Sequence, residues 1–148
     1  MEVFWRLLFA HMLSDFTFQT DNLVKWKKEN HYGVILHSAV FMVVSYVVCW
    51  DILTVPWKTI LGFSIIGWIG VLGISMTHFY IDRYKVDITN KNESKDTLAS
   101  FLLDQLAHFL FIALFIAPSV FNGVKPSKLW ILGSILIFVT HFTAILIY

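Results

Sequence analysis

Histidine and aspartate occur four residues apart at three places in this sequence. The three pairs are His11 with Asp15, His78 with Asp82, and Asp104 with His108. On an α-helix this spacing places both side chains on one face, about one turn apart. Neutral imidazole and carboxylate groups together can bind zinc, iron or manganese. Each pair therefore predicts a helix face that presents two metal ligands.

All three pairs lie inside or at the edge of strongly apolar segments. An ionisable residue within a transmembrane helix is costly, so it usually faces the bundle interior and has a partner there. The pairs therefore predict one shared polar site, to which His37 would add a seventh side chain. A four-coordinate zinc ion needs fewer ligands than this, so the extra groups favour either two metal ions or carboxylates that support the ligands.

The expected metal ligands are the members of the three pairs: His11, Asp15, His78, Asp82, Asp104 and His108. Zinc is the first choice of divalent metal ion, with manganese and iron as alternatives. Such an ion would activate water at the membrane surface. Either Asp15 or Asp82 would then act as a general base, and His37 is expected to be a ligand, a proton shuttle or a helix contact.

Apolar residues dominate the composition: 57% of the 148 residues are hydrophobic, 14% are charged, and the mean hydropathy is +0.71. A soluble domain usually has about a quarter charged residues. Because so few polar groups cannot cover the apolar surface in water, we expect an integral membrane protein with a single domain, residues 1–148. The net charge of +1 and the lack of a long basic run argue against a nucleic-acid partner.

Five apolar segments predict an all-α, polytopic membrane bundle of about five transmembrane helices. They cover residues 3–18, 33–50, 59–80, 97–121 and 128–148. Crossing the hydrocarbon takes about 20 residues, so segment 3–18 is short. It is expected either to span the bilayer while buried among other helices or to be partial or re-entrant. The glycines of segment 59–80 allow close helix packing, which favours the centre of the bundle for that segment.

Polar connectors separate the apolar segments. They cover residues 20–32, 51–58, 83–96 and 122–127. The first is expected to be an interfacial helix or loop. The second reads as a tight turn in which Pro56 opens the next helix. Asn90, Lys91 and Asn92 predict a turn in the third connector, and Gly123 with Pro126 predicts one in the fourth.

The distribution of lysine and arginine predicts the orientation in the membrane. With five spans, seven of these residues lie in connectors on one side and four on the other. The first side is expected to be cytoplasmic and the N-terminus to lie outside. Since a helix rises about 1.5 Å per residue, the three pairs and His37 all fall within roughly two to three turns of the cytoplasmic interface. One pocket near the inner leaflet could then hold them all.

The order of these polar residues resembles a known family. The pattern is His11…Asp15-Phe16…Gln19, His37, His78…Asp82…Lys85 and Asp104-Gln105…His108. It is similar to that of bacterial and phage membrane proteins catalogued only as a domain of unknown function. The resemblance extends to about residue 121 and implies a multi-pass protein of the bacterial inner (cytoplasmic) membrane, with no known reaction.

A looser similarity is to bacterial inner-membrane proteins labelled metal-dependent hydrolases, which also place histidines and aspartates at helix ends. Their His-Arg…Thr-His-Ser pattern is missing here, and His37-Ser38 is its only fragment.

Three classes of function are open. The first is a membrane-embedded, metal-dependent hydrolase of a lipid or lipid-linked phosphate or ester, with membrane lipid as partner and Lys25, Lys85 and Gln19 at its head group. The second is an ion- or proton-coupled transport protein, for which a homo-oligomer would be needed because five short spans show no inverted repeat. The third is a non-catalytic membrane partner that is held together by its polar core.

Overall fold

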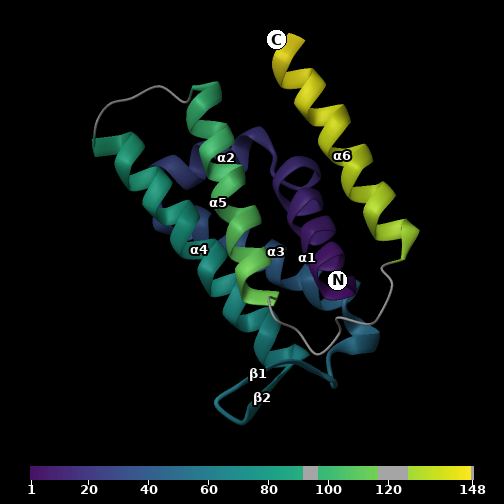
Figure 1. The fold of residues 1–148 in the computed structure, drawn as a ribbon. Helices are drawn as coiled ribbons and strands as arrows, with labels where there is room; N and C mark the ends of the chain where they lie inside the picture. Colours follow the sequence, from purple (N-terminus) through teal and green to yellow (C-terminus); the bar gives the residue numbers. More distant parts are fainter. Residues whose placement is uncertain (92–96, 117–126, 148) are drawn as a thin grey trace.

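The computed structural model describes residues 1–91, 97–116 and 127–147, which form six α-helices and one β-hairpin (Figure 1). The helices are α1 (Glu2–Met12), α2 (Asp21–Glu29), α3 (His31–Val48), α4 (Gly67–Lys91), α5 (Leu98–Ile116) and α6 (Lys128–Ile147). A π-helical turn, Leu13–Thr17, continues α1 without a break. The predicted helical architecture is therefore confirmed in its coarse form, and the hairpin is its exception.

Helix α1 is the central element of the fold (Figure 1). It contacts α3, α5 and α6, and its apolar side chains, among them Val3, Leu7 and Ala10, are fully buried. This burial on several sides shows that the neighbouring helices enclose α1.

Segment 59–80 was predicted to lie at the centre of the bundle, and its helical part packs against α3 and α5 and buries Val71 and Ile74. Its glycines allow close approach, because Gly67 lies against the backbone of Leu53, Gly70 lies against the ring of Trp57 and Gly73 faces α5.

The start of the predicted third helix is a β-hairpin rather than a helix. Strands β1 (Pro56–Ile60) and β2 (Phe63–Ile66) pair antiparallel, and Pro56 begins a strand instead of opening a helix. Leu61 and Gly62 both have positive φ, at 50° and 85°, as a two-residue hairpin turn requires. A short run of β-branched residues around a glycine favours this outcome, and α4 begins only at Gly67.

Helix α4 is longer at its other end than the apolar pattern indicates. The predicted connector begins at residue 83, but the helix continues to Lys91, so Asn90 and Lys91 are helical rather than part of a turn. Arg83 and Asp87 form an ion pair of 2.8 Å one turn apart on this polar extension. Asn92 and the turn predicted at Gly123 and Pro126 lie outside the described residues.

Two of the described helices are long and apolar enough to cross a membrane: His31–Val48 and Leu98–Phe115. Length and composition alone are weak evidence for a span, because buried core helices share them. Large apolar side chains are also exposed on α3, α5 and α6, and Val47, Leu103 and Leu129 are each about two-thirds exposed. Many exposed apolar side chains of this size are typical of a surface that contacts another molecule or a membrane.

Arg6 fastens the start of α1 to the end of α3. Its guanidinium donates to the Glu2 carboxylate at 2.8 Å, to the Val48 carbonyl at 3.0 Å and to both oxygens of Asp51. The hydrogen bond from Arg6 holds the pKa of the Asp51 carboxyl below its usual value. A charged side chain of the central helix is thus paired with two carboxylates and with a carbonyl at the end of α3.

The junction of α2 and α3 depends on a close backbone contact. Asn30, which is extended, ends α2 and caps α3 by accepting from the amide of Tyr32 at 2.9 Å. Gly33 then lies so close to α2 that an added Cβ would be 2.5 Å from the backbone nitrogen of Lys27. This contact fixes where the lysines of α2 lie.

We expect Gly33→Ala to lower the free energy of unfolding by about 1–3 kcal/mol, the usual cost of overpacking against rigid backbone. Thermal unfolding in detergent measures it. Gly73→Ala is the matched control, since its Cβ would meet the Phe115 ring at an ordinary 3.4 Å. Its effect should stay within about 1 kcal/mol. Equal shifts in the two variants would contradict the special role of the α2–α3 contact.

Candidate metal centre

The structure brings the seven predicted histidines and aspartates together in the interior. They come from five segments: His11 from α1, Asp15 from the π-helical turn, His37 from α3, His78 and Asp82 from α4, and Asp104 and His108 from α5. Each side chain is between 0 and 7% exposed. A cluster of so many ionisable groups away from water requires internal partners for every polar atom.

The π-helical turn sets the position of Asp15. The Phe18 amide donates to the Leu13 carbonyl at 3.0 Å, five residues back, and the Ser14 hydroxyl donates to the Ala10 carbonyl at 2.8 Å. The wider turn still leaves Asp15 Oδ1 3.5 Å from His11 Nδ1. Single π-helical turns inside helices are frequent at functional sites.

Four donor atoms lie at the middle of the cluster, and those of His37, His78 and Asp82 lie close enough to one another to share one ion. They are Asp15 Oδ1, His37 Nε2, His78 Nε2 and Asp82 Oδ2. The two imidazole nitrogens are 3.1 Å apart. His37 Nε2 is 3.2 Å from each carboxylate oxygen, and His78 Nε2 is 3.7 Å from each. Ligands at about 2.0–2.1 Å from a tetrahedral zinc ion lie about 3.3–3.4 Å from one another.

Gln105 fixes the tautomer of His11. Its amide nitrogen lies 3.4 Å from Asp15 Oδ2 and 3.5 Å from Asp104 Oδ2. Because ionised carboxylates only accept hydrogen bonds, the NH2 group of the amide must be the side that faces them. The amide oxygen therefore faces His11 Nε2, at 3.2 Å, and accepts its hydrogen. In the neutral ring Nδ1 then carries no hydrogen, and its lone pair faces the carboxylate of Asp15.

His108 shows the same arrangement on the other side of the cluster. Its Nδ1 donates to the backbone carbonyl of Asp104 at 3.0 Å. In the neutral ring Nε2 therefore carries no hydrogen and has the lone pair. That Nε2 lies 3.9 Å from Asp82 Oδ1. A hydrogen bond from the far ring nitrogen to a carbonyl or amide oxygen is the usual support of a metal-binding histidine.

Several atoms of the cluster have no hydrogen-bond partner among the described residues. They are His11 Nδ1, Asp15 Oδ1, His37 Nδ1, Asp104 Oδ1 and His108 Nε2. A buried acceptor without a donor costs about 1–3 kcal/mol, and more if it is charged. A divalent cation would satisfy acceptors that face one another, and nitrogen with carboxylate oxygen suits zinc, manganese or iron. The donor set therefore fits a metal ion.

Asp82 lies between two groups of donors. Its Oδ2 faces His37 and His78, and its Oδ1 faces His108. Asp104 Oδ1 is 3.8 Å from His108 Nδ1, and the oxygens and nitrogens of Asp82, Asp104 and His108 lie close enough to share an ion. These residues could therefore hold one divalent ion or two.

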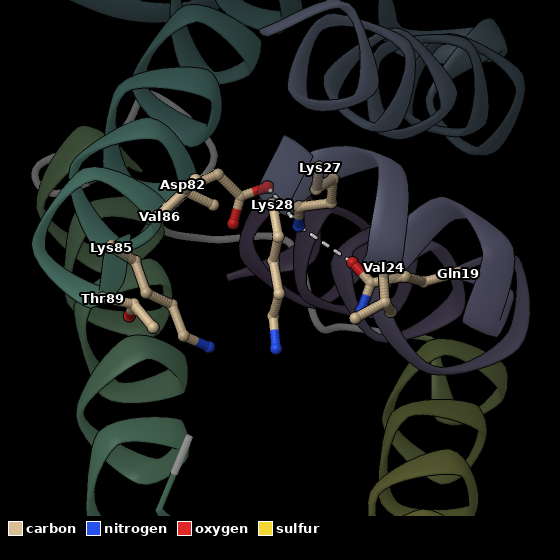
Figure 2. Close-up of a pocket in the computed structure, with 8 residues that line it drawn as sticks. All are labelled: Gln19, Val24, Lys27, Lys28, Asp82, Lys85, Val86 and Thr89. Atoms are coloured by element: carbon tan, nitrogen blue, oxygen red, sulfur yellow. Dashed lines mark hydrogen bonds and ion pairs between the residues drawn. The ribbon is translucent and has the colours of Figure 1, made fainter. Parts of the chain in front are cut away.

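Two lysines reach the cluster from its edge. Lys27 Nζ donates to Asp82 Oδ2 and to Gln19 Oε1, each at 2.9 Å, and Lys85 Nζ donates to Asp104 Oδ2 at 3.1 Å. Figure 2 shows the Lys27 amine between Asp82 and Gln19. Lys85 and Gln19 were predicted from the sequence as head-group residues, and both lie at this edge.

A small pocket opens at this edge, with a volume of about 70 Å³. Its polar lining comprises Gln19, Lys27, Lys28, Asp82, Lys85 and Thr89 (Figure 2). Lys25 is exposed on α2 and is not among the residues that line it. Lys25 as a head-group residue stays a prediction, as do the catalytic roles of Asp15, Asp82 and His37.

Sequence reasoning missed Gln105 and Lys27 as site residues. Gln105 directly follows Asp104 and has a visible signal, because it belongs to the Asp-Gln…His pattern. Lys27 has no such signal, since only the packing of α2 on α4 brings it to Asp82.

The fold and the cluster define a class: a helical domain with membrane-length helices and a buried histidine–aspartate centre. The chain belongs to the DUF3307 family, described as proteins of unknown function, whose model matches residues 3–132. The predicted family membership is thus confirmed, while the looser similarity to hydrolases stays a prediction. No curated protein and no solved structure matches the chain.

We expect Gln105→Leu to weaken zinc binding about 10- to 100-fold, the usual effect of removing the group that orients a histidine ligand. Competition with a chromophoric chelator measures the affinity. His141→Ala is the control, because His141 contacts Phe16 and its own helix rather than the cluster. Unchanged affinity in a folded Gln105→Leu protein would contradict the orienting role.

Proposed function

We propose that this protein is a membrane-embedded, metal-dependent hydrolase of a lipid or lipid-linked phosphate or ester, with its site near the cytoplasmic face of the bacterial inner membrane. One observation carries the proposal. The lone pairs of His11 Nδ1 and His108 Nε2, fixed by Gln105 and the Asp104 carbonyl, face buried carboxylates. A cation turns these repulsive pairs into ligands, and zinc suits the donor set best.

The membrane part of the proposal is a multi-pass chain of about five spans. Two membrane-length helices and the exposed apolar faces of α3, α5 and α6 support it. Helix α2 and the C-terminal end of α4 lie toward the same end of the molecule (Figure 1), and Lys27 and Lys85 contact the histidine–aspartate cluster from them. An excess of lysine and arginine on one side is typical of the cytoplasmic face.

The expected ligands are the seven clustered side chains, with Asp82 shared between the two donor groups. A bound divalent ion supplies a nucleophilic water near neutral pH and polarises the phosphoryl or carbonyl oxygen that is attacked. Asp82 lines the pocket, so it is better placed than Asp15 to accept a proton from a water in it. Lys27, which donates to Asp82 Oδ2, holds that carboxylate toward the pocket.

Metal analysis by mass spectrometry tests the site directly. Protein purified without a histidine tag is expected to contain at least about one zinc, manganese or iron ion per chain. His78→Ala and Asp104→Ala should lose most of it, while His141→Ala should keep it. A metal-free protein whose thermal stability is unaffected by a chelator would contradict the proposal and favour a purely structural polar core.

Phosphate release from a lipid phosphate in mixed micelles tests the reaction. A chelator should abolish the release, and added zinc should restore it. Asp82→Asn should lower the rate by about 100-fold or more, because it removes both a metal ligand and the general base. A metal-loaded protein that hydrolyses neither phosphate nor ester lipids, yet moves protons or cations into liposomes in an Asp104-dependent way, would favour transport instead.

A further inference from the structure

The β-hairpin has an apolar tip that none of the described residues covers. Leu61 and Phe63 are 94% and 80% exposed, and Ile60, which pairs with Phe63, is also exposed. Residues 59–66 carry no charge. The hairpin projects from the end of the molecule where α4 begins (Figure 1). Because apolar surface in water is unfavourable, this tip favours contact with an apolar environment.

The turn residue Leu61 is also unfavourable for the backbone. Its φ is 50°, in the left-handed region that disfavours any side chain with a Cβ. Two-residue turns with positive φ at both positions strongly prefer Asn-Gly or Asp-Gly. Asparagine before Gly62 would therefore give both a better turn and a polar tip. Leucine there is unfavourable in backbone conformation and in hydration, and strain of this kind at an exposed site indicates a function.

The base of the hairpin is held firmly, so the tip alone projects. Trp57 is fully buried, and its indole N–H donates to the carbonyl of Ile52 at 2.9 Å. Lys58, the one charged residue of the two strands, donates through Nζ to the carbonyls of Leu114 and Phe115 at 3.3 and 3.1 Å. A cation is favourable at the C-terminal end of a helix such as α5. The charge of the hairpin is thus directed away from its tip.

The hairpin base lies where both membrane-length helices end. Those helices are His31–Val48 and Leu98–Phe115, and Lys58 contacts the last residue of the second. Trp50 follows the first helix by two residues, and its exposed ring lies 6.3 Å from that of Trp68, at the start of α4. Tryptophan is enriched at membrane–water interfaces. The hairpin therefore lies at the level where these helices would leave a bilayer.

The open edges of the hairpin limit how deep its tip can enter a bilayer. A two-stranded sheet leaves backbone groups unpaired on both outer edges, and such edges do not occur in the hydrocarbon region. Thr59 and Ser64, which pair across the strands, are exposed and polar. The head-group/acyl boundary accepts apolar groups to a depth of about 5–10 Å. The apolar side chains are concentrated at the tip, which favours insertion over strand pairing with another protein.

We propose that residues 60–63 insert into the head-group/acyl boundary of the bilayer, in the leaflet away from the cytoplasm. The occupant of this surface is lipid, because the tip lacks charge and lies beside tryptophans at the ends of two membrane-length helices. A bilayer sets no exact length for such a tip and requires only that it be apolar. The inference rests on the membrane location in the proposed function, and it adds a lipid contact remote from the metal centre.

Depth-dependent fluorescence quenching tests the insertion. Phe63→Cys in the full chain is labelled with an environment-sensitive fluorophore and placed in nanodiscs of phosphatidylcholine and phosphatidylglycerol; Cys49, the only cysteine, is fully buried. A lipid nitroxide near the head group should quench the label at least about twofold more than aqueous iodide or a nitroxide at the chain end. Quenching by iodide alone would overturn the insertion, and stronger quenching by the deep nitroxide would overturn the boundary depth.

A change of the turn residue separates a lipid contact from a role in folding. Leu61→Asn should leave the thermal midpoint in detergent unchanged or higher, because asparagine suits the turn. The same change should abolish lipid quenching of the label at position 63 and expose the label to iodide. Ser64→Asn, at an exposed polar position beside the tip, should change neither measurement. A lower midpoint with lipid quenching retained would overturn the proposal by assigning Leu61 to the fold.

Two further label positions distinguish this proposal from the membrane topology. Leu106→Cys, half-exposed near the middle of α5, should be quenched by lipid nitroxides, and Asp87→Cys, on the polar end of α4, by iodide. Lipid quenching at position 106 but not at the tip would overturn the tip insertion alone. Lipid quenching at the tip but not at position 106 would contradict the spans and leave the insertion standing. Protection of the tip that depends on protein concentration, without lipid quenching, would overturn it in favour of a second copy.

Discussion

The structure depends on one electrostatic constraint: seven ionisable side chains are packed out of reach of water and face one another. Burial of a carboxylate beside an imidazole lone pair is unfavourable unless a positive charge lies between them. The protein supplies part of that charge from the edge, through Lys27 on Asp82 and Lys85 on Asp104. The centre, where His11 Nδ1 and His108 Nε2 lie, receives none from the described residues.

The arrangement of the helices follows from this constraint. α1 is enclosed by α3, α5 and α6, which lets its polar end meet ligands from several directions. α2 is short and polar, and Gly33 holds it close to α3, so that Lys27 and Lys28 line the pocket beside the cluster. At the N-terminal end of α1, Arg6 donates to the Val48 carbonyl and to Asp51. The charged groups of the central helix are therefore paired near its two ends.

The polar side chains could be predicted from the sequence better than the backbone that connects them. A spacing of four placed each histidine and aspartate on a common face, and the apolar setting required those faces to turn inward. Helix boundaries near residues 31–48 and 98–116 also follow from hydropathy. Residues 56–66 were misjudged because a short apolar run with β-branched residues suits a strand as well as a helix, and only the Leu61–Gly62 turn decides between them. The contacts of Lys27 and Gln105 required the tertiary structure.

The π-helical turn at Leu13–Thr17 has a consequence for how the chain tolerates length changes. Its ring closes five residues back instead of four, so it accommodates one residue that a regular helix would not need. Deleting a residue there would restore regular winding, rotate everything downstream by about 100°, and turn Asp15 away from His37. Among relatives of this chain, the segment between the first histidine and Asp15 should therefore keep a constant length, while the hairpin tip at Leu61–Gly62 is free to vary.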